Sequence, residues 1–214
     1  MSSPADSVAT PSPRPDPIRY VALGDSYTIG TSIPSTDAWP NQLVRSLADR
    51  VPIELVDNLA VNGYTSNDLI RTELPALADV QPEFVSILIG VNDVVRGVSA
   101  DRYRTNIAQI LGAVLGIVPR DRIVVVSTPD YTRTPRGADF GDPEQQRAAL
   151  NQINAIMAAE AAERGIAVVD ISSIANQAGA DSTLVAADLL HPSAVQYSRW
   201  VELIAPVVEG LLVD

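Results

Sequence analysis

Apolar and polar positions along the chain form alternating blocks that predict five strand–helix units. Apolar, β-favouring runs typical of buried parallel strands lie at 18–23, 53–59, 84–90, 122–129 and 166–172. Helical spacing of apolar residues follows over 37–50, 66–79, 99–119, 142–165 and 193–212, with kinks or breaks expected at Pro75 and Pro206. The alternation predicts one domain over residues 18–214, an α/β/α sandwich with three layers around a five-stranded parallel sheet.

The first 17 residues have a different pattern. They are rich in proline and serine and lack the long apolar stretch of a secretory signal, so residues 1–17 are predicted to be a flexible tail. Nowhere do eighteen apolar residues run together, which predicts no membrane span. A cytoplasmic location is therefore expected, with a secreted form trimmed of its signal as the alternative.

Composition removes several classes of function. The net charge is −11, and all fifteen basic residues are arginine, without any basic stripe, so no nucleic-acid partner is expected. The absence of cysteine excludes disulfides, thiolate nucleophiles and thiolate metal sites. His191 is the only histidine, which excludes two-histidine metal motifs. Only carboxylates remain as ligands, so no metal is expected. No cofactor is expected either, and the expected partner is a small-molecule substrate.

Four polar segments interrupt the regular pattern, at 24–38, 60–66, 90–98 and 129–142. Each follows a predicted strand. The carboxyl ends of parallel strands meet at one edge of a sheet, so these segments are expected to gather there. The segment that holds His191 comes from the end of the chain to join them, and the sequence predicts one cleft.

Residues in these segments supply the groups that a serine hydrolase needs. Ser26 in "GDSYTIG" is the candidate nucleophile, His191 the candidate base, and Asp188, three residues before it, can accept the proton of its ring. The backbone N–H groups of Ser26 and Gly63 and the side-chain amide of Asn92 are candidate oxyanion donors. Any one of them alone is more commonly a turn or surface residue, so the prediction rests on their conjunction.

The motifs Gly-Asp-Ser, Asn-Gly, Gly-x-Asn-Asp and Asp-x-x-His-Pro occur in this order over nearly the whole domain. This arrangement resembles the SGNH, or GDSL-type, hydrolase superfamily. The resemblance implies a flavodoxin-like sandwich and metal-independent esterase, lipase or carbohydrate-deacetylase activity. It also implies the roles proposed above for Ser26, His191, Asp188, Gly63 and Asn92.

Two further features of the motifs concern residues outside these roles. Tyr27 stands where leucine gives the GDSL name, and we expect it to form part of the pocket wall. Asp25 and Asp93 also match the motifs, and hydrogen bonds from them are expected to fix the turns.

The expected substrate is a soluble ester with a short acyl chain, and Tyr27, Tyr131 and Phe140 are candidate substrate-binding residues. The segment 129–142 is polar and lacks the broad apolar surface of a lipase lid. Acetyl removal from a carbohydrate such as xylan, and lysophospholipase or thioesterase activity, are alternatives within the same family. A flavin- or nucleotide-binding module is the alternative outside hydrolases, because similar sheets bind such ligands. A non-catalytic scaffold is weaker, because no triad residue is missing.

Overall fold

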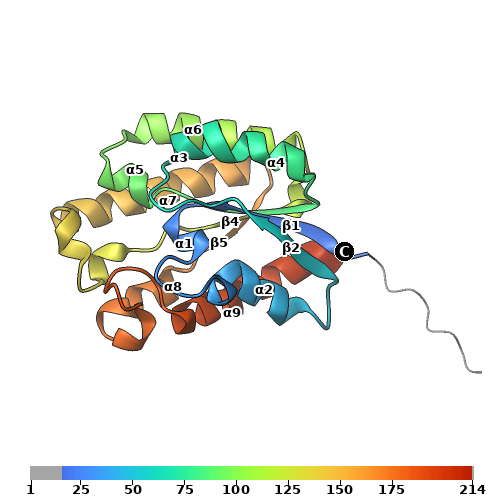
Figure 1. The fold of residues 1–214 in the computed structure, drawn as a ribbon. Helices are drawn as coiled ribbons and strands as arrows, with labels where there is room; N and C mark the ends of the chain where they lie inside the picture. The colour runs from blue at the N-terminus through green and yellow to red at the C-terminus, as the bar shows by residue number, and fades with distance from the viewer. Residues whose placement is uncertain (1–15, 214) are drawn as a thin grey trace, which may run out of the picture.

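The computed structural model describes residues 16–213 and has five parallel strands in the order β2-β1-β3-β4-β5 (Figure 1). The strands are β1 (Ile18–Gly24), β2 (Ile53–Asn58), β3 (Phe84–Leu88), β4 (Ile123–Val126) and β5 (Ala167–Val169). The predicted sandwich is therefore confirmed. Most of the expected tail, residues 1–15, lies outside the described residues.

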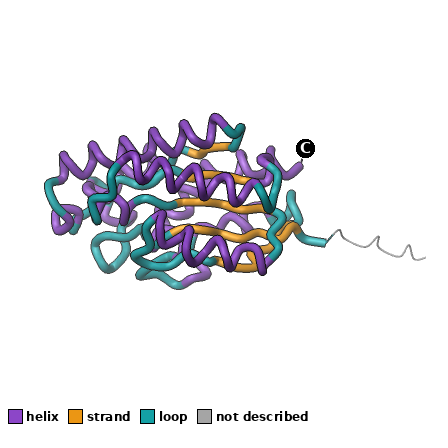
Figure 2. Tube along the Cα trace, turned by 90° about the horizontal axis from the view of Figure 1, so that it is seen from above, coloured by secondary structure: helices purple, strands orange, loops and turns teal. Residues whose placement is uncertain are grey.

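Helices cover both faces of this sheet. One layer is built on α6 (Ala100–Leu115) and α7 (Pro143–Glu163), which pack against each other. The opposite layer is built on α2 (Trp39–Leu47) and α9 (Ala194–Val213). Figure 2 shows the strands running alongside one another between these layers. Because both faces are covered, every residue of the central strand β3 is buried. No helix within residues 16–213 is long and apolar enough to cross a membrane.

Shorter elements complete the chain. On the way into and out of the strands lie α1 (Ser26–Ile29), η1 (Ser35–Asp37), α3 (Ser66–Asp68), η2 (Leu69–Glu73), α4 (Leu74–Val80), α5 (Val91–Val95) and η3 (Arg120–Arg122). The later part of the chain adds η4 (Tyr131–Arg133), η5 (Gly137–Phe140), α8 (Ser172–Ala175), η6 (Asn176–Gly179) and η7 (Ser182–Leu184). Several of these short elements lie in the polar segments that interrupted the sequence pattern.

Two predicted helices differ in detail from the structure. Asp37 does not cap α2, because it ends the 3₁₀ turn η1 and the helix begins two residues later, beside Pro40. The helix expected at 66–79 is divided into α3, the π-helical η2 and α4. Pro75 lacks an N–H and its ring crowds the carbonyl of the preceding turn, so the wider π turn accommodates it. By contrast, α9 continues through Pro206.

The register of the two central strands brings their carboxyl ends level. Gly24 of β1 pairs with Leu88 of β3, so the turns after both strands begin side by side. The strand order reverses between β1 and β3, which is the point where open α/β sheets hold their ligands. Gly24 has φ of 151°, and a Cβ there would lie 2.2 Å from the carbonyl oxygen of Leu88. Glycine is therefore required where the chain leaves β1.

Candidate active site

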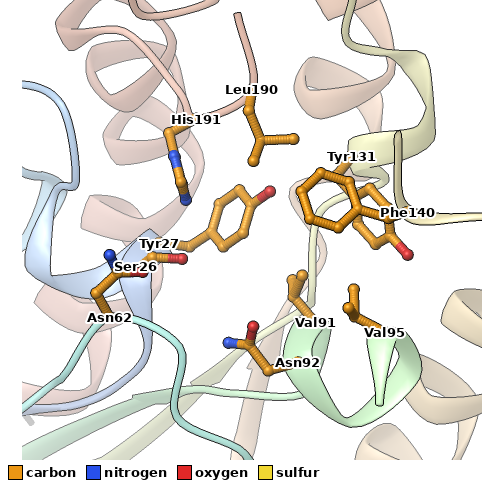
Figure 3. A pocket seen from close by; sticks show the side chains of 10 residues that line it. All are labelled: Ser26, Tyr27, Asn62, Val91, Asn92, Val95, Tyr131, Phe140, Leu190 and His191. Atoms are coloured by element: carbon orange, nitrogen blue, oxygen red, sulfur yellow. The ribbon is translucent and has the colours of Figure 1, made fainter. Parts of the chain in front are cut away.

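A pocket of about 190 Å³ opens at this edge of the sheet (Figure 3). All four polar segments singled out in the sequence contribute to it, together with the segment that holds His191. It is lined by Ser26, Tyr27, Asn62, Val91, Asn92, Val95, Tyr131, Phe140, Leu190 and His191. Of the residues predicted for the site, Gly63 and Asp188 do not line the pocket; Gly63 follows the lining residue Asn62 in the chain, and Asp188 is hydrogen-bonded to the lining residue His191.

The turn that holds Ser26 is fixed by backbone hydrogen bonds. Asp25 caps α1 by accepting a hydrogen bond from the Tyr27 N–H at 3.0 Å. The Ser26 carbonyl accepts the N–H groups of Gly30 and Thr31, at 3.2 and 3.1 Å. Ser26 itself is 4% exposed and faces the pocket. The candidate nucleophile thus lies on a rigid turn directly beyond the central strand β1.

His191 and Asp188 form a close pair on the loop before α9. The distance between His191 Nδ1 and Asp188 Oδ2 is 2.5 Å. A carboxylate can only accept there, so the proton of a neutral ring is on Nδ1 and the Nε2 lone pair is free. Figure 3 shows the ring pointing into the pocket toward Ser26, although the structure contains no hydrogen bond between Ser26 and His191. Such contacts commonly tighten only when substrate binds.

Asp188 is held by four donors, two on each oxygen. Oδ1 accepts the N–H groups of Leu190 and His191, at 3.0 and 2.9 Å. Oδ2 accepts from His191 Nδ1 and also from the hydroxyl of Ser32, at 2.6 Å. Partial burial opposes ionisation, but the hydrogen bonds from Ser32 and His191 outweigh it and hold the pKa of Asp188 well below its usual range. The residue is therefore an anion throughout the neutral pH range.

The predicted oxyanion donors are the N–H groups of Ser26 and Gly63 and the side-chain amide of Asn92. Within residues 16–213, neither the Ser26 N–H nor the Gly63 N–H donates to another protein group. The Asn92 amide nitrogen donates one hydrogen to the Tyr64 carbonyl at 2.9 Å, which fixes the orientation of the amide. Its second hydrogen makes a long bond to Asp25 Oδ2, at 3.5 Å. The two backbone N–H groups therefore have no acceptor in the described part of the chain, and the long bond from Asn92 to Asp25 is weak enough for an oxyanion to replace it.

Three buried carboxyl groups surround the Ser26 turn. Burial raises the pKa of Asp25 to about 7, and the nearby Asp93 adds to the increase. Burial also raises the pKa of Glu73 to about 9, although its hydrogen bond from the Gly24 N–H, at 2.8 Å, opposes the shift. Asp93 accepts both the N–H and the hydroxyl of Ser66. Asp25 and Asp93 thus fix the turns, as the sequence predicted.

Aromatic and aliphatic side chains form the rest of the pocket. Tyr131 and Phe140 pack edge to face with ring centroids 5.7 Å apart. The Tyr131 hydroxyl donates to Gln146 at 2.5 Å, which ties η4 to α7. The ring of Tyr27 packs against that of His191, with ring centroids 5.2 Å apart. All three candidate substrate-binding residues, Tyr27, Tyr131 and Phe140, therefore line the pocket.

Several residues at the site had not been predicted. Asn62, Val91, Val95 and Leu190 line the pocket, and each is adjacent to or near a recognised motif residue, which is the signal that could have found them. Ser32 carries no such signal, because its contact with Asp188 joins residues 156 positions apart. No group of three or more His, Cys, Asp or Glu side chains among residues 16–213 could hold a metal ion.

Comparison with known proteins identifies the family. A profile of the GDSL-like lipase/acylhydrolase family matches residues 22–199. The chain belongs to this family. A lipase of Streptomyces rimosus is 28% identical to it in an alignment 201 positions long, and the match covers 78% of this chain and 75% of the relative. An arylesterase of Vibrio mimicus is 31% identical over 98 residues, 45% of this chain and 48% of the relative.

The fold is also that of solved SGNH hydrolases. An acetyl xylan esterase variant from Geobacillus stearothermophilus superimposes with a TM-score of 0.72 and 20% identity, over 90% of this chain and 95% of its own. Membership of the GDSL-like lipase/acylhydrolase family makes the chain an SGNH hydrolase and a serine-dependent carboxylic ester hydrolase. Family membership decides against the alternative of a flavin- or nucleotide-binding module.

Proposed function

We propose that the protein hydrolyses esters of short acyl chains by way of an acyl-enzyme at Ser26. His191 is the general base, Asp188 orients it, and the N–H groups of Ser26 and Gly63 and the Asn92 amide stabilise the oxyanion. The observation that carries this proposal is that His191, whose Nδ1 lies 2.5 Å from Asp188 Oδ2, lines the same pocket as Ser26. An imidazole with its proton fixed on Nδ1 presents a basic Nε2 to a neighbouring hydroxyl.

The reaction has two steps, acylation and deacylation of Ser26, and in each step His191 takes up one proton and gives it back. His191 Nε2 takes the proton of the Ser26 hydroxyl as its oxygen attacks the ester carbonyl, and the carbonyl oxygen becomes an anion facing the three donors. When the tetrahedral intermediate collapses, the C–O bond to the alcohol breaks and His191 gives its proton to the departing alcohol. Water then attacks the acyl-enzyme while His191 takes its proton. When this second intermediate collapses, the bond between the acyl carbon and the Ser26 oxygen breaks, the carboxylic acid leaves and His191 returns the proton to Ser26.

The size and lining of the pocket support a small apolar acyl group. Its volume of about 190 Å³ is below the range of roughly 300–1,000 Å³ for sites of drug-sized ligands. Apart from the proposed reacting groups, Asn62 is the one lining residue with an amide, and the others are aliphatic or aromatic. Such a lining offers few partners for the hydroxyls of a sugar ring, and its volume does not suit the long chains of lysophospholipids and acyl thioesters.

Acetylated carbohydrate is the second candidate, because an acetyl group also fits a small pocket and the sugar would then lie outside it. One panel separates the candidates: p-nitrophenyl esters from acetate to dodecanoate, measured beside acetylated xylan. We expect kcat/KM to be highest for the shorter chains and low on xylan. Release of acetate from xylan at a rate above that of the synthetic acetate would favour the deacetylase instead.

Phe140 is expected to limit acyl length. Phe140→Ala removes a wall of the pocket and should move the optimum to longer chains, with a change of about tenfold or more in the ratio of kcat/KM values between long and short esters. Tyr131→Phe is the matched control, since it keeps the ring and removes only the hydrogen bond to Gln146. Equal chain-length profiles for the Phe140 variant and the wild type would contradict this role.

A labelling experiment tests the nucleophile itself. An organophosphonate should add once per chain, and peptide mapping should find the adduct on Ser26. Ser26→Ala should abolish both the adduct and turnover. An adduct on another residue, or turnover retained by the variant, would contradict the proposed mechanism.

A further inference from the structure

Ser32 connects the turn that holds Ser26 with the loop that holds the base. The Ser32 hydroxyl donates to Asp188 Oδ2 at 2.6 Å, on the same oxygen that accepts the His191 ring proton. The preceding residue, Thr31, donates its N–H to the Ser26 carbonyl at 3.1 Å. Two consecutive residues therefore link the nucleophile's own backbone to the acid.

This contact differs in origin from the other three hydrogen bonds to Asp188. Those come from Leu190 and His191, within three residues along the chain, and they move with the loop. Only a donor from another element can hold the carboxylate in place relative to the Ser26 turn. Among the described donors to Asp188, Ser32 is the one that comes from elsewhere in the chain.

The backbone around this contact is strained. Only three non-glycine residues within residues 16–213 have positive φ, and two of them, Ser32 at 69° and Leu189 at 64°, lie at Asp188. The left-handed region is unfavourable for side chains with a Cβ, above all for a bulky residue such as leucine. Strain of this kind persists where surrounding contacts over-determine the conformation, and it concentrates at functional sites. The third residue, Gln81, ends α4 away from the pocket.

We propose that Ser32 is a positioning residue that fixes the Asp188–His191 pair relative to Ser26 and so sets the separation of base and nucleophile. This inference rests on the proposed function, because it assigns His191 as the base that acts on Ser26. Ser32 does not touch the substrate in this scheme. Its hydroxyl acts through Asp188, and proton transfer is the step most sensitive to small displacements of the base.

Ser32→Ala and Ser32→Gly separate the hydroxyl from the backbone strain. Both remove the hydrogen bond, but glycine also relieves the left-handed conformation, so Ser32→Gly should have the higher Tm. If the hydroxyl positions the base, both variants lose about tenfold in kcat with KM within about twofold. Gln81→Gly is the matched control, because it relieves a left-handed residue far from the site and should leave kcat unchanged.

Ser32→Asn and Ser32→Asp are a second pair of variants. Their new side chains have nearly the same shape and differ in charge and in the ability to donate a hydrogen bond. Both residues tolerate left-handed backbone better than most, and Ser32 is exposed, so the larger side chain has room. The amide of the Asn variant can donate to Asp188, whereas the Asp variant adds a like charge beside it. We expect Ser32→Asn to recover most of kcat and Ser32→Asp to fall below Ser32→Ala.

A spectroscopic readout tests the inference without turnover. Because the chain has one histidine, the imidazole Nδ1–H signal in a proton NMR spectrum belongs to His191 alone. Loss of the Ser32 contact frees the Asp188 loop, so exchange of this proton with water should become about tenfold faster in Ser32→Ala and recover in Ser32→Asn. The result holds whether or not an ester is hydrolysed.

Distinct results overturn the two proposals. Unchanged proton exchange and unchanged kcat in Ser32→Ala would overturn the role of Ser32 while leaving the esterase mechanism intact. Equal behaviour of the Asn and Asp variants, with kcat following Tm across the series, would reduce Ser32 to a structural residue. An inactive wild type whose proton exchange still responds to Ser32 would instead overturn the proposed function alone.

Discussion

The nucleophile side and the base side of the pocket are held in place by different forces. Ser26 follows a central strand, and the carboxyl groups of Asp25 and Glu73 around it are almost completely buried. The side chains of His191 and Asp188 are 12% and 24% exposed, on a loop fixed by hydrogen bonds. The nucleophile thus depends on the packing of the core, whereas the base depends on polar contacts of a partly exposed loop, which can change with little effect on the fold.

The two sides also respond to pH in opposite directions. Burial raises the pKa of Asp25 to about 7 and of Glu73 to about 9, so these groups hold protons that the unfolded chain has lost. Their contribution to stability therefore falls as pH rises from about 4 through those values. The pKa of Asp188 is lowered, so its contribution is present above pH about 4 and is lost as pH falls further.

Removing the base should produce the largest effect on activity and little effect on stability. His191→Ala should lower kcat by about 10⁴-fold or more, since the chain contains no other imidazole. Ester hydrolysis and thermal unfolding followed by circular dichroism measure the two quantities. A folded variant with near-normal turnover would disprove the mechanism, and a large drop in Tm would disprove the contrast between the two sides.

Asn92→Ala tests a polar group on the nucleophile side. Loss of one oxyanion donor should lower kcat by about 10²-fold with a modest change in KM, because the contact strengthens in the transition state. Asn62→Ala, at the other amide that lines the pocket, is the control and should affect mainly KM. A raised KM with intact kcat in the Asn92 variant would make it a substrate-binding residue.

Glu73→Gln should alter stability on the nucleophile side without altering chemistry. Glutamine keeps an acceptor for the Gly24 N–H and cannot ionise. The wild type should lose several degrees of Tm between pH 5 and 9, and the variant should lose less, because the raised pKa of Glu73 is removed. Glu54→Gln, at an exposed position on β2, is the control and should leave the slope unchanged. Parallel curves for wild type and Glu73→Gln would show that this carboxyl does not set the slope.

Removal of divalent metal ions should have the smallest effect on activity, whether a metal would act beside the nucleophile or beside the base. The proposed mechanism has no step that needs a metal, and the chain has one histidine and no cysteine. Dialysis against EDTA should therefore leave kcat and KM unchanged. A loss of activity that a divalent ion restores would require a different mechanism.

The sequence alone predicted the five strands, the alternation with helices and the four segments that line the pocket. Strand residues such as Phe84 and Leu88 form uninterrupted apolar runs because both faces of a central parallel strand are buried. The motifs that hold Ser26, Asn92 and His191 were readable because their chemistry needs particular residue types next to turns. These features are local, since each depends on residues close together in the chain.

Only the tertiary structure decided which distant groups meet. The strand order and the pairing of Gly24 with Leu88 bring the turns of Ser26 and Asn92 side by side, and no local pattern specifies that register. The raised pKa of Glu73 comes from burial by other elements, which composition does not reveal. The contact of Ser32 with Asp188 joins residues 156 positions apart through an exposed serine with no sequence signal. Hydrophobic pattern fixes which elements form, whereas long-range contacts become visible only when the elements have packed.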